Sequence, residues 1–168
     1  SLDNLYIRET MKKGYVCQTS VFKESEERII GGFVRNSIPG IYDFINVYDF
    51  KSLYPSIIRT FNIDPLTFVG KTPGKNLIIA PNRAAFKKDP GLLPEIISSL
   101  MEEREKVKRE KDELTSYAIK ILLNSMFGVT ANPSFRFFNT DMANAITHFG
   151  QFLIKMTAEE IKKKGYDI

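Results

Sequence analysis

Apolar residues recur every three or four positions in three stretches of the second half of the chain. This spacing places them on one face of an α-helix, which has 3.6 residues per turn. We therefore predict helices over residues 91–113, about 115–127 and about 141–164, with Gly165 as the C-cap of the third. The apolar positions are Leu93, Ile96, Ile97, Leu100, Met101 and Val107 in the first helix, Ile119, Leu122, Leu123 and Met126 in the second, and Met142, Ile146, Phe149, Leu153, Met156 and Ile161 in the third.

The first two predicted helices are expected to form a hairpin, with a tight reversal at residues 112–116. The apolar face of the second helix would contact the first. Lys120 and Asn124 are four residues apart and would share the opposite face. The third helix is expected to pack beneath a sheet.

A different pattern surrounds residue 50. Residues 45–50 (Ile-Asn-Val-Tyr-Asp-Phe) predict a largely buried strand, and residues 52–61 predict a helix. Asp49 would then end a strand just before a helix whose first turn has free backbone amides. This layout is typical of a metal-phosphate site, because such amides bind phosphate and a carboxylate holds the accompanying divalent cation.

The remaining segments give weaker signals. Residues 1–28 are mixed and charged, and they predict a helix before Gly14 whose packing is incomplete. Residues 70–91 are rich in Pro, Gly, Asn and Lys and predict a mobile loop with one short strand at residues 77–80. The sequence contains no internal repeat or low-complexity tract.

Composition sets broad limits on the class of protein. The 168 residues are 43% hydrophobic, which is enough for one modest domain or a pair of lobes. The net charge of +4 suits contact with a polyanion, although many ordinary proteins are as basic. The single cysteine, Cys17, excludes an internal disulfide framework, and no apolar run is long enough to span a bilayer. We expect an intracellular protein without a membrane partner.

Two motifs resemble those of the family B DNA polymerases. Residues 49–56 (Asp-Phe-Lys-Ser-Leu-Tyr-Pro-Ser) resemble motif A, Asp-x-x-Ser-Leu-Tyr-Pro-Ser. Residues 120–128 (Lys-Ile-Leu-Leu-Asn-Ser-Met-Phe-Gly) resemble motif B, Lys-x-x-x-Asn-Ser-x-Tyr-Gly. Residues 31–42 are similar to the approach to motif A, and residues 92–96 to the start of the fingers. The likeness runs from about residue 30 to the end and favours a bacterial branch, with an archaeal member still open.

The resemblance implies an α+β fold, in which part of a polymerase palm (a small antiparallel sheet with packed helices) carries a helical-hairpin fingers subdomain. It assigns residues 1–28 to the remnant of a preceding N-terminal or exonuclease region and 29–91 to the first part of the palm. Residues 92–128 would be the fingers and 129–168 the second part of the palm. The family's Asp-Thr-Asp motif would follow residue 168, so the chain is expected to be a fragment that is inactive alone.

The implied reaction adds deoxynucleoside triphosphates to a primer 3′ end by two-metal nucleotidyl transfer with Mg²⁺. Asp49 would be the catalytic residue and bind both ions, and the Phe50 carbonyl would bind one. Without the motif, Asp49 would be interpreted as a strand-end carboxylate that caps the next helix.

Nucleotide binding is implied for the residues that follow Asp49. The backbone amides of Ser52 and Leu53 would meet the phosphates. Tyr54 would lie under the sugar, where a rigid ring leaves no volume for a 2′-hydroxyl. Taken alone, Tyr54 would be a core residue with a satisfied hydroxyl.

Cations of the fingers are implied to offset the triphosphate charge. The resemblance points to Arg104, Lys108 and Lys120, and it places Asn124 over the nascent base pair. In isolation, the charged run around Arg104 would be a solvated helix surface, where Glu and Lys commonly pair.

The end of motif B is implied to contact DNA. Phe127 stands where the family usually has Tyr, so a hydroxyl that probes the minor groove is lost, and Gly128 follows it. Residues 135–138 (Phe-Arg-Phe-Phe) predict a buried connector with Arg136 near the template strand. His148, the only histidine, is given no catalytic role, because no ligand-spaced partner accompanies it.

The favoured interpretation is a fragment of a DNA-directed DNA polymerase whose partners are primer-template DNA and deoxynucleoside triphosphates. A sliding clamp would bind through other regions, and the expected location is cytoplasmic, with the nucleoid. Two alternatives stay open: a catalytically inactive polymerase-like DNA-binding or scaffold module, and a basic helical binding domain.

Overall fold

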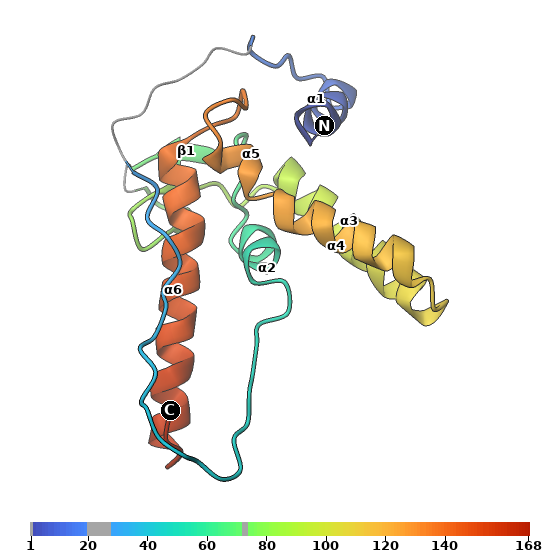
Figure 1. Ribbon diagram of the computed structural model, residues 1–168. Helices are drawn as coiled ribbons and strands as arrows, with labels where there is room; N and C mark the ends of the chain where they lie inside the picture. The colour runs from blue at the N-terminus through green and yellow to red at the C-terminus, as the bar shows by residue number, and fades with distance from the viewer. Residues whose placement is uncertain (1, 20–27, 72–73) are drawn as a thin grey trace.

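The computed structural model describes residues 2–19, 28–71 and 74–168. Helices and a small sheet are arranged around one apolar core (Figure 1). The helices are α1 (Leu2–Lys12), α2 (Leu53–Thr60), α3 (Leu92–Arg109), α4 (Glu113–Ser125), α5 (Gly128–Ala131) and α6 (Thr140–Lys163), and the strands are β1 (Phe68–Gly70), β2 (Ile78–Ile79) and β3 (Ala85–Phe86). Within these ranges, no helix is both long and apolar enough to cross a membrane.

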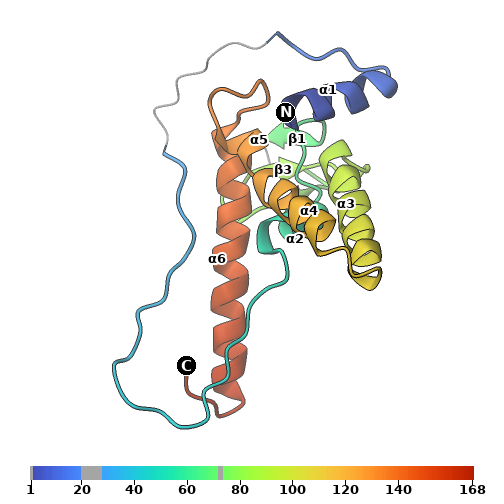
Figure 2. The same cartoon turned by 45° about the vertical axis from the view of Figure 1, so that its right-hand side comes forward.

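The predicted hairpin is confirmed as α3 and α4, which lie side by side and project from the rest of the fold (Figures 1 and 2). The chain reverses at residues 110–112, slightly before the predicted reversal at 112–116, and Lys111 there has a left-handed φ of 61°. Asp112 then caps α4, because its side chain accepts a hydrogen bond from the Thr115 N–H at 3.0 Å. Ile119 and Leu123 are buried against α3, while Lys120 and Asn124 are exposed, as the spacing predicts.

The third predicted helix is α6, and Gly165 follows its end with a φ of 86°. Its apolar face contacts α2, where the Phe61 and Phe149 rings stack with centroids 3.7 Å apart. The sequence predicted that this helix would pack beneath a sheet, but its apolar face packs against α2 instead. Among the described residues, the sheet region is hydrogen-bonded to the start of α6, where Asn82 donates to the Asp141 carbonyl at 2.8 Å.

The sheet is antiparallel with strand order β1-β3-β2. Phe86 of β3 pairs with Phe68 of β1 on one side and Ile78 of β2 on the other. The predicted strand at 77–80 is therefore confirmed as β2. The expected mobile loop at 70–91 also contains β3, whose Ala85 and Phe86 are fully buried.

The predicted buried strand at residues 45–50 is wrong. These residues have no regular secondary structure, and the side chains of Ile45, Val47 and Tyr48 are 68%, 89% and 83% exposed. An isolated strand cannot satisfy its backbone without a neighbour, and no strand within the described ranges pairs with this one. The segment belongs to a long excursion from residue 28 to α2 that first follows α6 (Figure 2).

Helix α1 is better packed than the sequence predicts. Tyr6 is 1% exposed, and its hydroxyl donates to the carboxylate of Asp64 at 3.0 Å. The helix also contacts α3. The expectation of incomplete packing for residues 1–28 is therefore met only in part by this helix, because Tyr6 and Thr10 are buried while Met11 is 65% exposed. Residues 20–27 lie outside the described residues.

Candidate nucleotide and DNA site

The start of α2 has the geometry of a phosphate site. Ser52 adopts a left-handed conformation (φ 51°, ψ 58°) that turns the exposed loop into the helix. The Ser56 N–H donates to the Ser52 carbonyl at 2.9 Å, and the Ser56 hydroxyl donates to the Lys51 carbonyl at 3.0 Å. The amides of Leu53 and Tyr54 precede the first intrahelical bond, so they remain available as donors to an anion.

Tyr54 joins the two motif segments. Its ring lies 5.2 Å from that of Phe127, centroid to centroid, with the planes tilted by 35°. Phe127 follows α4 and keeps helical dihedrals (φ −56°, ψ −37°) before Gly128 starts α5. The structure therefore brings residues 53–54 and 127–128 together, although more than seventy residues separate them in the sequence.

Two other predicted residues lie on the face of α4 that leads to Phe127. Lys120, Asn124 and Phe127 are spaced by four and three residues, which places them in one row along the helix. The side chains of Lys120 and Asn124 are exposed. This row starts with a cation and an amide and ends at the ring of Tyr54.

The face of α3 that carries Arg104, Glu105 and Lys108 is linked to the loop before α2. Lys51 Nζ lies 2.6 Å from Glu105 Oε1, and Lys108 Nζ lies 3.9 Å from the same oxygen. The hydrogen bond and charge of Lys51 lower the pKa of Glu105. Arg104 is half-buried, and its Nε has no hydrogen-bond partner in the part of the chain that the structure describes. No signal in the sequence singled out Glu105, because it is one of several acids in a charged run.

Asp49 and Phe50 lie in the exposed loop just before α2. Across residues 2–19, 28–71 and 74–168, no hydrogen bond or ion pair engages the Asp49 carboxylate, and no three acidic, His or Cys side chains gather as a metal site. A carboxylate and a carbonyl are oxygen donors of the kind Mg²⁺ prefers, and Mg²⁺ uses few protein ligands beside water and phosphate. The two residues therefore fit one side of such a site.

Arg136 is engaged within the chain. Its Nε lies 3.0 Å from Asp3 Oδ2, and its Nη1 donates to the Gln18 carbonyl at 3.0 Å. These contacts connect the segment after α5 to α1 and the residues that follow it. A contact of Arg136 with the template strand stays a prediction. His148 is bonded to the Asn144 carbonyl at 2.6 Å within α6.

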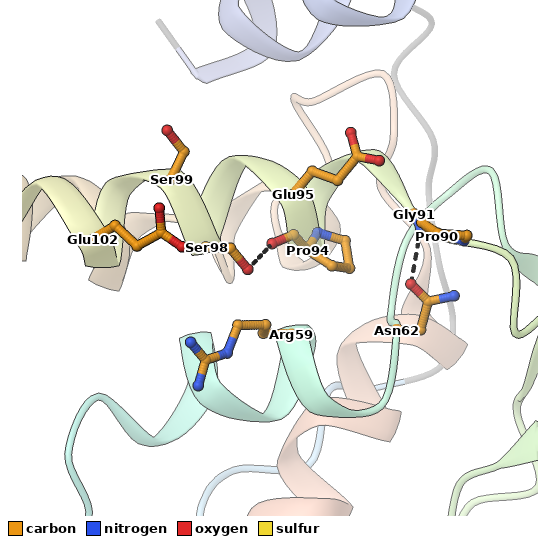
Figure 3. Close-up of a pocket in the computed structure, with 9 residues that line it drawn as sticks. All are labelled: Arg59, Asn62, Pro90, Gly91, Pro94, Glu95, Ser98, Ser99 and Glu102. Carbon is orange, nitrogen blue, oxygen red and sulfur yellow. Dashed lines mark hydrogen bonds between the residues drawn. The ribbon is translucent and has the colours of Figure 1, made fainter.

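A pocket of about 440 Å³ opens between α2 and the first half of α3 (Figure 3). Arg59 lies across from Ser98, whose hydroxyl donates to the Pro94 carbonyl at 2.9 Å. No predicted nucleotide-binding residue lines this pocket, so it is separate from the site described above. Its lining residues are Arg59, Asn62, Pro90, Gly91, Pro94, Glu95, Ser98, Ser99 and Glu102.

The fold and the site together define a mixed helical protein with a small antiparallel sheet, in which the start of α2 presents free backbone amides beside a charged helical hairpin. The sequence profile of DNA polymerase family B matches residues 3–168, and the chain belongs to this family. The resemblance seen in the two motifs is thereby confirmed.

Individual relatives agree with this assignment. The chain is 34% identical to DNA polymerase II of Escherichia coli (strain K12) over 168 residues, which cover 98% of this chain and 21% of that protein. It is 36% identical to a DNA polymerase of Thermococcus sp. (strain 9oN-7) over 147 residues, covering 80% of this chain and 19% of that protein. The chain thus spans about a fifth of the length of these relatives.

A solved structure supports the fold. The family B DNA polymerase of Pyrobaculum calidifontis matches with a TM-score of 0.72 at 24% identity, over 97% of this chain and 24% of that one.

Proposed function

We propose that this chain forms the palm and fingers portion of a DNA-directed DNA polymerase that extends a primer with deoxynucleoside triphosphates. The contact between Tyr54 and Phe127 is the observation that carries the proposal, because it joins the segments of motifs A and B at one place. In this assignment residues 29–91 and 129–168 belong to the palm, residues 92–128 form the fingers and residues 1–28 come from a preceding region.

The triphosphate would be held from two sides. The predicted amides of Ser52 and Leu53 would face it from the start of α2, where the Leu53 and Tyr54 amides precede the first intrahelical bond. Cations would approach from the hairpin. Arg104 and Lys108 lie on the face of α3 that Glu105 ties to Lys51. The Nε of Arg104 is buried and has no hydrogen-bond partner among the described residues, which supports a role in binding an anion. Lys120 supplies a further charge from α4.

Asp49 and the Phe50 carbonyl would hold Mg²⁺ beside these phosphates. Bound there, Mg²⁺ supplies charge neutralisation for the oxygens that enter and leave the reacting phosphorus. Because Asp49 is exposed and has no ion-pair partner within the described ranges, its carboxylate is free to take this part. The aromatic side chain of Tyr54 would limit the space at the sugar.

The nascent base pair and the DNA would lie along the row that ends α4. Asn124 and Phe127 would contact the pair, and the lack of a side chain at Gly128 would allow close approach of the backbone. Arg136 would reach the template strand only after exchanging its bond to Asp3 for a phosphate.

The test is primer extension by the complete natural protein with Mg²⁺. Asp49→Asn is expected to lower the rate roughly 100-fold or more, since it removes a charge that holds the metal. Lys120→Ala should lower kcat/KM by about 10-fold or more, the effect of one charge-assisted hydrogen bond. Asp43→Asn, in the same exposed loop, and Lys106→Ala, on an exposed position of α3, are the matched controls.

Retention of full activity by both Asp49→Asn and Lys120→Ala would refute the proposal. Tight binding of primer-template DNA without any extension by the unaltered protein would instead support the inactive scaffold.

A further inference from the structure

Gly150 lies in α6 directly against the ring of Tyr54. A Cβ atom built on Gly150 would meet Tyr54 Cε1 at 3.3 Å, Ile57 Cδ1 at 3.6 Å and Leu53 Cδ2 at 3.7 Å. The last two distances are ordinary van der Waals contacts, whereas the first is tighter than most real Cβ contacts. A methyl group here would therefore act on Tyr54 and leave the two aliphatic neighbours in place.

Gly32 approaches the same side chain from the segment between residue 28 and α2, which runs alongside α6. A Cβ atom on Gly32 would lie 3.1 Å from the Tyr54 hydroxyl oxygen. The ring of Phe127 bounds Tyr54 from the end of α4. Three segments that are distant in sequence thus enclose one aromatic side chain, and two of them do so with a residue that has no side chain.

We propose that Gly150 and Gly32 are positioning residues that set how far the ring of Tyr54 projects, and that they thereby set the sugar selectivity of the nucleotide site. This inference rests on the proposed function. Neither glycine would touch the nucleotide, so both act through Tyr54.

The physical reason is the stiffness of the arrangement. A close-packed contact cannot absorb an added methyl group without displacement of one partner. Gly150 is buried in the α-helix that stacks on α2, so the ring of Tyr54 is the part that yields. Its displacement by a few tenths of an ångström is directed away from α6, into the space that would admit the sugar. A pocket that distinguishes a single oxygen is sensitive to such a change.

The experiment compares three Gly-to-Ala variants in the complete natural protein. Gly150→Ala and Gly32→Ala add a methyl group that contacts the Tyr54 side chain. A Cβ on Gly31 meets nothing within 4 Å, so Gly31→Ala is the matched control. Alanine also favours a helix over glycine, so Gly150→Ala is not expected to prevent folding. We expect Gly150→Ala to raise the KM for deoxynucleotides and to change the ratio of kcat/KM between deoxy- and ribonucleotides about 10-fold. Gly31→Ala should leave both unchanged.

A double-mutant cycle with Tyr54→Ala separates positioning from general packing. If Gly150 acts through the ring, Gly150→Ala should not alter the selectivity ratio once the ring is removed. Equal effects of Gly150→Ala with and without the Tyr54→Ala substitution would overturn the inference, and so would an unchanged ratio in Gly150→Ala alone.

A second measurement does not depend on activity. With 3-fluorotyrosine at position 54, the ¹⁹F resonance should shift in Gly150→Ala and Gly32→Ala and stay in place in Gly31→Ala. An unmoved resonance in the first two variants would refute the claim that the two glycines position the Tyr54 ring. If the unaltered protein failed to extend primers but the resonance shifted as expected, the proposed function and the selectivity role would be refuted. The positioning of the Tyr54 ring by the two glycines would still be established.

Discussion

At the scale of single residues, Tyr54 combines contacts that give it a fixed orientation. Its ring meets Phe127, and two glycines leave just enough room for its edge and hydroxyl. The motif in the sequence was sufficient to mark this residue, because it carries a residue type at a set distance from Asp49. The glycines that surround it come from other segments, and nothing in their local sequence indicates a contact with Tyr54.

Tyr54→Ala is expected to admit ribonucleotides. Removing the ring opens volume where a 2′-hydroxyl would lie, so the preference for deoxynucleotides in primer extension should fall at least 10-fold. Tyr54→Phe keeps the ring and should keep most of the preference. Equal selectivity in the Ala variant and the unaltered protein would show that Tyr54 is only a packing residue.

Asp64 is a buried carboxylate that no sequence pattern indicated. It is fully buried, and it accepts hydrogen bonds from the Tyr6 hydroxyl at 3.0 Å and from the N–H groups of Leu66 and Leu93, both at 2.6 Å. These donors belong to α1, to the loop after α2 and to the first turn of α3. Because two of them are 58 and 29 residues away, the role of Asp64 becomes visible only in the fold.

Stability should depend on pH through Asp64. Burial raises the pKa of Asp64 above its ordinary value of 3.8, although the Leu93 and Leu66 amides and the Tyr6 hydroxyl oppose part of the shift. The folded pKa then exceeds the unfolded one, so the folded state binds more protons between the two values. The contribution of Asp64 to the free energy of unfolding is therefore largest below about pH 4 and is lost as the pH rises through the folded pKa.

Urea unfolding of the unaltered protein and of Asp64→Asn as a function of pH measures this effect. Asn has one acceptor oxygen and cannot satisfy both amides, so the variant should be less stable by roughly 2 kcal/mol or more. It also lacks the titration, so the difference between the two proteins should shrink with rising pH. A difference that grows with pH would contradict the assignment. Asp89→Asn, at an exposed position, is the control.

At the scale of elements, the helices were predictable because each carries its information locally. Periodic apolar positions located α3, α4 and α6, and Gly165 marked the end of α6. The strands were less accessible. β1 and β3 have three and two residues, too few for an alternating pattern to appear. The apolar residues 45–50 do look like a strand, but strand formation needs a pairing partner, which a local pattern cannot specify.

The start of α6 offers a test of whether a single capping residue stabilises a helix. The side chain of Asn139 accepts a hydrogen bond from the Met142 N–H at 2.9 Å and caps the 24-residue helix. Asn139→Ala removes this acceptor and should lower the free energy of unfolding by about 1 kcal/mol. Asn139→Ser retains a capping oxygen and should recover most of the loss. Chemical denaturation of both variants decides the matter, and equal stability of Asn139→Ala and the unaltered protein would show that the cap contributes nothing.

At the scale of the whole molecule, α2 is the helix on which the other elements converge. It contacts α3, α4 and α6, although it has only eight residues. Its start forms the candidate phosphate site, and its buried residues Ile57 and Ile58 belong to the main core. The position of the candidate site therefore depends on packing that is remote from the site, which local sequence patterns could not describe.

The stack of Phe61 on Phe149 fixes α2 against α6 and provides the test at this scale. Phe149 is 6% exposed, whereas Phe152, three residues along the same helix, is 54% exposed. Phe149→Ala leaves a cavity at the α2–α6 contact and should cost roughly 3–5 kcal/mol in the free energy of unfolding. Phe152→Ala removes the same side chain from an exposed position and should change it by about 0.5 kcal/mol or less.

Both variants would be measured by urea denaturation of the complete protein. Similar losses of unfolding free energy in the two variants would mean that all faces of α6 contribute to stability, not mainly the face that contacts α2. A large loss confined to Phe149→Ala would show that the contact between α2 and α6 holds the site in place. Because Gly150 follows Phe149 directly, this loosened contact should also release the ring of Tyr54, so its ¹⁹F resonance should broaden in Phe149→Ala and stay sharp in Phe152→Ala.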